Sequence, residues 1–151
     1  MKRLILILAV GTIAFGTLFA FQTDERHLFS QAQIERIEKS IVKSLECDIP
    51  DLQINAALTL HRLRGAAPDY GWDRCIIPLM RILNREENNP PPRLIAAMAL
   101  HELRSERGDF AISRNAQFTD NPRVKRYCAI LARTRILEQG KLRSQRLSMN
   151  P

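Results

Sequence analysis

The feature that most constrains the fold is a short motif that occurs twice, forty residues apart. Residues 56–63 read AALTLHRL and residues 96–103 read AAMALHEL, so five of the eight positions are identical. Each copy has the spacing of a short helix, with small residues on one side and leucines on the other. One such helix cannot bury its apolar face alone, whereas stacked copies can. The repeat therefore predicts an all-α chain built as a short α-solenoid.

The composition agrees with one helical domain. The chain has 151 residues, of which 45% are hydrophobic and only 6% aromatic. This balance suits helix-on-helix packing better than a β-sandwich. The formal net charge of +7 favours acidic partners, anionic lipid or nucleic acid, but it bears on association and not on fold.

Capping residues and apolar spacing divide residues 30–138 into six predicted helices. They run over 30–46, 50–64, 74–85, 93–105, 110–118 and 123–138. Ser30 with Gln33 forms a capping box, and the stripe of the first helix is Ile34, Ile37, Ile41 and Leu45. Asp48, Asp73 and the run 119–122 are the other expected caps.

Glycine and proline mark the expected ends. Gly65 should stop the second helix, and residues 84–92, with three consecutive prolines, should form an extended connector. Residues 107–109 should break the chain before a short helix with Phe110, Ala111 and Ala116 inward. Gly140 should end the last helix, leaving residues 139–151 as a basic, disordered tail.

The first residues have the pattern of an export signal. Lys2 and Arg3 precede an uncharged run over residues 4–21. We expect residues 1–22 to be a signal peptide or an uncleaved membrane anchor, followed by a linker over residues 23–29. Both alternatives place the rest of the chain in the periplasm or outside the cell, or anchored at the inner membrane. The three cysteines, Cys47, Cys75 and Cys128, are then either small buried hydrophobes or include a Cys47–Cys75 disulfide.

Three stretches resemble HEAT repeats. They are residues 50–53 running into Ala56 and Ala57, residues 76–79 (IIPL), and residues 120–125 (DNPRVK). In that family each unit is an antiparallel helix pair. The first helix often carries Ile-Pro-x-Leu, and the second starts with Asp-Pro-x-Val-Arg. The family's basic residue early in the second helix corresponds to Gln53, Arg93 and Lys125. The resemblance covers about residues 30–138 and implies about three helix pairs, whose second helices line an inner face.

Members of this family are mostly scaffolds that present a groove to protein partners. Some small members are similar to phycobilisome-lyase-type proteins, which assist chromophore attachment. The resemblance therefore implies an interaction module more than any particular chemistry.

His61 and His101 occupy equivalent positions of the two motif copies and should lie on adjacent helices. Two imidazoles are too few for a metal site, and no carboxylate falls at obvious ligand spacing with them. Packing or surface roles, including interaction with the helix dipole, are the simpler interpretation. No metal or other cofactor is expected.

Several arginines gather near the ends of predicted helices. Read functionally they form a basic ridge for an acidic partner, and read structurally they satisfy helix dipoles. Trp72 is either an exposed interface anchor or a residue that closes the space between helix pairs. The residues proposed for partner binding are Arg62, Arg64, Arg104, Arg133, Arg135 and Trp72.

The chain shows no nucleophile motif and no glycine-rich phosphate loop. The sequence therefore predicts an exported, non-enzymatic module that binds a protein partner, with self-association through exposed ends as a further expectation. Nucleic acid is disfavoured because export separates the protein from it and because no aromatics are interleaved with the basic residues. A basic binder of anionic lipid or polymer, and an accessory subunit of an envelope enzyme, are the alternatives.

Overall fold

The computed structural model describes residues 30–87 and 89–149. The expected signal or anchor segment (1–22) and linker (23–29) lie outside this part of the chain. The described residues form six helices and no strand, so the all-α prediction is confirmed. The helices are α2 (Gln31–Glu46), α3 (Pro50–Ala66), α4 (Asp73–Asn84), α5 (Pro90–Leu103), α6 (Glu106–Phe118) and α7 (Pro122–Met149).

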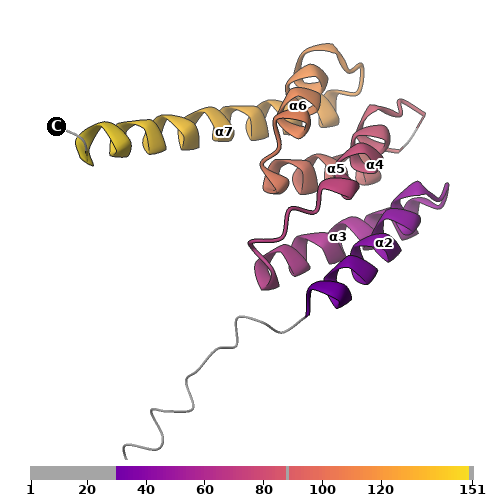
Figure 1. Cartoon of the computed structure of the whole chain (residues 1–151). Coiled ribbons are helices and arrows are strands. Elements are labelled where there is room, and N and C mark those ends of the chain that lie inside the picture. The colour runs from indigo at the N-terminus through magenta and orange to yellow at the C-terminus, as the bar shows by residue number, and fades with distance from the viewer. Residues whose placement is uncertain (1–29, 88, 150–151) are drawn as a thin grey trace, which may run out of the picture.

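The helices pack antiparallel in two layers (Figure 1). The first layer contains α2, α4 and α6 side by side in that order, and the second contains α3, α5 and α7 in the same way. The core lies between the layers and is built mainly from leucines and alanines. Its most buried members include Leu45, Leu60, Leu79, Leu83 and Leu100.

The repeated motif explains how α3 and α5 pack side by side. Ala56 and Ala57 in α3, and Ala96 and Ala97 in α5, are all buried. Small side chains at a helix contact let the two backbones approach closely. The leucines that follow them, Leu60 and Leu100, are almost completely buried and fill the core. The packing role predicted for both motif copies is confirmed.

Two of the predicted caps are present. Ser30 and Gln33 form the capping box, and Asn121 Oδ1 accepts from the backbone N–H groups of Arg123 and Val124. Asp48 does not cap α3, because Ile49 is the N-cap and the Asp48 carboxylate accepts from Arg85 Nη1 instead. Asp73 is the first residue of α4 rather than its cap.

Two predicted breaks lie elsewhere in the structure, and a third, at Gly140, is absent. The prolines at 90–92 begin α5 instead of extending the connector, because the first turn of a helix has no partner for the N–H that proline lacks. The break expected at residues 107–109 falls at Arg104, where φ is 53°. Ser105 then caps α6 by accepting from the Gly108 N–H, so Gly108 lies inside the helix. Phe110, expected inside, is 67% exposed.

The prediction that the last helix stops at Gly140 is wrong. Helix α7 continues to Met149, and its last turns project beyond the other helices (Figure 1). A glycine inside a helix costs only about 1 kcal/mol relative to alanine, and no proline follows before residue 151 to end the helix. Residues 139–149 are therefore a basic helical extension and not a disordered tail.

The three cysteines are free thiols, so the alternative of a Cys47–Cys75 disulfide is wrong. Cys47 follows the end of α2 and its thiol lies 2.9 Å from the Ser44 carbonyl oxygen, whereas Cys75 lies at the start of α4. Cys75 and Cys128 are fully buried, as expected of small hydrophobes, and Cys47 is half-buried.

Candidate functional site

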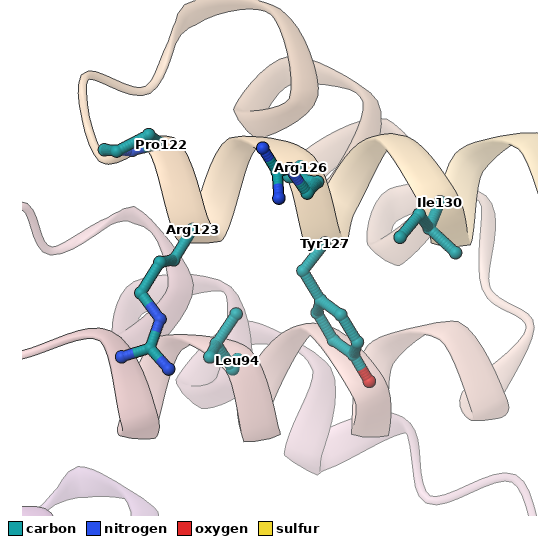
Figure 2. A pocket seen from close by; sticks show the side chains of 6 residues that line it. All are labelled: Leu94, Pro122, Arg123, Arg126, Tyr127 and Ile130. Carbon is teal, nitrogen blue, oxygen red and sulfur yellow. The ribbon is translucent and has the colours of Figure 1, made fainter.

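The layer of α3, α5 and α7 carries two hollows on its surface. The first, which we call the apolar groove, lies between α5 and α7 and has a volume of about 420 Å³. Figure 2 shows Arg123 and Tyr127 extending from α7 towards α5, on either side of Leu94. The lining residues are Leu94, Pro122, Arg123, Arg126, Tyr127 and Ile130.

Helix periodicity explains why α7 offers these residues to the groove. Arg123, Tyr127 and Ile130 are spaced by four and three residues, so they share one side of the helix. Val124 and Cys128, fully buried in the core, fix the orientation of that helix. Tyr127 therefore lies at the margin of the core, and Ile130 is 55% exposed.

The groove is apolar but its charged rim is basic. Arg123 and Arg126 are exposed, and residues 121–137 contain no aspartate or glutamate. Burial raises the pKa of the Tyr127 phenol, and the negative charge of Glu102 raises it further. The phenol is therefore neutral at physiological pH and remains a hydrogen-bond donor beside Leu94.

The second hollow, which we call the polar hollow, lies at the C-terminal ends of α3 and α5, beside α7. Its volume is about 450 Å³. It is lined by His61, Arg64, Gly65, His101, Glu102, Arg104 and Glu138. Basic, acidic and imidazole groups thus converge at one place on the same layer.

A carboxylate pairs with one histidine of this hollow. His61 Nδ1 contacts Glu102 Oε2 and thereby connects α3 to α5. This contact was not apparent from sequence spacing, because Glu102 is next to His101 in sequence and yet turns towards His61. Within residues 30–87 and 89–149, no group of three or more His, Cys, Asp or Glu side chains is placed to hold a metal ion.

His101 has a different environment from His61. Its Nδ1 is buried and has no hydrogen-bond partner among the described residues. Burial lowers the pKa of His101 below the ordinary value of 6.5, and the positive charge of Arg135 lowers it further. Since Glu138, Asp109 and Glu102 oppose this only partly, the ring is neutral at neutral pH.

The arginines singled out in the sequence divide into two groups. Arg135 is only 8% exposed, and it donates to the Asp109 carboxylate at 3.0 Å, to Glu138 at 3.2 Å and to the His101 carbonyl. It is therefore withdrawn from the surface, contrary to the partner-binding role proposed for it. Arg64 and Arg104 line the polar hollow, and Arg62 and Arg133 are exposed.

Trp72 closes the space between helix pairs and is not an exposed anchor. Its side chain is 1% exposed and packs edge-to-face on Tyr70, with ring centroids 4.9 Å apart. Trp72 is the N-cap of α4, with φ of 52°. The turn at Trp72 therefore directs the indole into the core, where it cannot meet a partner.

The groove residues were not identified from the sequence, although a signal existed. The signal is the spacing of Arg123, Tyr127 and Ile130, which places them on one side of the same helix. The sequence does not show that Leu94, in α5, lies beside α7, because only the fold brings these two helices together.

Comparisons of the chain with family models, curated proteins and solved structures found no match. The site must therefore be interpreted from its own residues. In the part of the chain that the structure describes, no helix combines the length and the apolar character needed to cross a membrane.

Proposed function

We propose that this chain is a short HEAT-like α-solenoid of three helix pairs, α2/α3, α4/α5 and α6/α7. The alternation of helices between two layers supports this architecture. Equivalent residues also have equivalent contacts: Gln53 donates to Leu45 and Cys47 carbonyls at the end of α2, and Arg93 donates to the Leu83 carbonyl near the end of α4. The second helices of the pairs then form one continuous face.

The function we propose is that of an exported, non-enzymatic protein–protein interaction module. The observation that carries this proposal is the apolar groove, which is an open hollow of ligand-binding size on the face of the second helices. Exposed apolar surface that is gathered in a hollow and rimmed by polar residues is typical of interaction sites. The export part of the proposal depends on the pattern of residues 1–22.

The chemistry of the polar hollow favours binding over catalysis. Its described lining residues are histidine, arginine, glycine and glutamate, without a serine or cysteine that could act as a nucleophile. His61 is already engaged with Glu102, and the buried Nδ1 of His101 has no hydrogen-bond partner among the described residues. The pair of histidines is better explained as part of the contact between α3, α5 and α7.

One observation favours the alternative of a binder of anionic lipid or polymer. The helical extension, residues 139–149, is exposed throughout and carries Lys141, Arg143 and Arg146 without an acidic residue. Charge alone would support association with anionic surfaces, and such binding weakens steeply as salt is added.

Affinity capture separates these functions. Residues 24–151 are immobilised and exposed to envelope extract at low and at high salt. A discrete protein retained at high salt supports the interaction module, because apolar contacts are not screened by salt. Heterogeneous anionic material that is lost on raising salt would reject the module and leave the basic surface as the function.

A further inference from the structure

We propose that the apolar groove binds an acidic amphipathic segment of the partner, with a large apolar side chain seated over Leu94 and carboxylates paired to Arg123 and Arg126. This inference rests on the proposed interaction module and names the chemistry of the segment that the module recognises. Three properties of the groove support this inference: its size, its apolar lining, and the positive charge of Arg123 and Arg126 beside that lining.

The size and lining of the groove suit an inserted apolar side chain. Its volume of about 420 Å³ lies in the range of about 300–1,000 Å³ typical of ligand pockets. Leu94 and Tyr127 are half-buried and form a firm base against the core, whereas Ile130 is exposed and free to contact an incoming residue. An aromatic or branched aliphatic anchor would bury this surface, as anchors of amphipathic helices do in grooves.

The positive charge around the groove favours acidic residues on either side of the apolar side chain that enters it. Arg123 and Arg126 both line the groove, and neither has an ion-pair partner among the described residues. Guanidinium groups pair carboxylates through two parallel hydrogen bonds, and such pairs strengthen beside apolar surface that excludes water. A neutral or basic segment would leave both charges uncompensated when the groove is covered.

The same charge argues against a second copy of this chain as occupant. Two of the most exposed apolar side chains of the copy, Leu147 and Met149, lie on the extension of α7. That segment carries Lys141, Arg143 and Arg146, so docking it in the groove would bring like charges together.

A displayed library of random twelve-residue peptides, selected on the full-length protein, tests the inference. The enriched peptides should contain at least two acidic residues within one helical turn of a large apolar residue. The most enriched peptide is then synthesised and its Kd measured against variants. Arg126→Glu should weaken binding about tenfold, because it replaces an attraction with a repulsion, and Ile130→Ser about fivefold, because it removes apolar contact.

Arg36→Glu is the control, because Arg36 is an exposed arginine on α2, in the other layer, and does not line the groove. It should change the Kd less than about twofold, since the charge lies away from the bound segment and is largely screened at that separation. Circular dichroism and thermal unfolding of each variant confirm that the fold is retained.

Three results would overturn the inference: no enrichment, enrichment of neutral or basic peptides, or equal loss of affinity in Arg126→Glu and Arg36→Glu. A dimer in sedimentation that Ile130→Ser dissociates would show instead that a second copy occupies the groove. If the wild type, Arg126→Glu and Ile130→Ser all capture the same discrete envelope protein, the groove is not the binding site. The proposal of an interaction module would then still hold.

Discussion

Replacing Arg93 with methionine should destabilise the fold more than any substitution of an exposed arginine. Arg93 is 2% exposed in α5, and its side chain connects three segments. Its Nε donates to the Leu83 carbonyl at 2.8 Å, and Nη2 donates to Asn115 Oδ1 at 3.2 Å and to Thr119 Oγ1 at 2.8 Å. These contacts fix the ends of α4 and α6 against α5.

The expected loss follows from the groups that the substitution leaves behind. The Leu83 carbonyl would lose a charged donor inside the core, and stranding such a group costs about 1–3 kcal/mol. The acceptors of Asn115 and Thr119 would also lose a donor, although the Asn115 amide keeps its bonds to Asn84 and Ala111. Because methionine fills much of the vacated volume and needs no desolvation, we expect a net loss of about 2–4 kcal/mol.

Urea unfolding followed by circular dichroism at 222 nm measures this loss. Arg133→Met is the control, and the free energy of unfolding should change by less than about 0.5 kcal/mol, because Arg133 is exposed. Arg93→Lys keeps one charged donor and should fall between the two, which preserves the test if the methionine variant does not fold. A loss below about 1 kcal/mol in Arg93→Met, or one equal to that of Arg133→Met, would refute the reasoning.

Three further predictions concern α7, the thiols and pH. Gly140→Ala should stabilise α7 by about 1 kcal/mol and raise helicity at 222 nm, because a Cβ there meets nothing within 4 Å. Ellman's reagent should modify Cys47 in the native protein, whereas Cys75 and Cys128 should react only after unfolding, since burial raises their pKa values to about 12 and about 11. As pH falls through 6.5, the unfolded chain binds a proton at His101 before the folded chain does, because the folded pKa is lowered. The free energy of unfolding should therefore fall, and His101→Gln should reduce that fall.

One result would contradict each of these three predictions. Unchanged helicity in Gly140→Ala would mean that the last turns of α7 do not persist in solution. Equal reaction rates of the three thiols would contradict the burial of Cys75 and Cys128. An identical pH dependence in His101→Gln and in the wild type would show that another group controls it.

Local chemistry made the helix pairs predictable. The capping box at Ser30, the proline at the start of α3 and the Asn121 cap depend on neighbours within four residues, so the sequence contains all the information needed. The repeated alanines and leucines likewise predict that α3 and α5 pack against each other. All-α packing with antiparallel neighbours follows from these features.

The misplaced breaks arise where one residue type has two roles. Proline ends a helix in its interior but is tolerated in the first turn, so the run at 90–92 marked a start and not a connector. Glycine stops a helix when φ is positive, yet Gly108 and Gly140 lie inside helices and the turn falls at Arg104. At Gly108 the close packing of α6 on α5 favours the helical role, because a Cβ there would lie 3.2 Å from the Leu100 carbonyl oxygen.

The candidate site was less predictable because its residues meet through the fold. The motif placed His61 and His101 on neighbouring helices, and both do line the polar hollow. The partner of His61, Glu102, and the groove between Leu94 and Tyr127 depend on side-chain directions across three helices. Neither spacing nor composition contains that information.

The structure also separates two uses of positive charge that look alike in the sequence. Arg93 and Arg135 turn inward and donate to carbonyls at the ends of α4 and α5, where the helix dipole is negative. Removing either would strand those carbonyls, so their charge is committed to the fold. Arg123 and Arg126 lie on the open side of α7 beside apolar surface and satisfy no such group in the part of the chain that the structure describes. A basic net charge therefore does not by itself predict a binding surface, because part of it is committed to the helix ends, and in the proposed module the arginines that contact a partner would be those that the helix ends do not use.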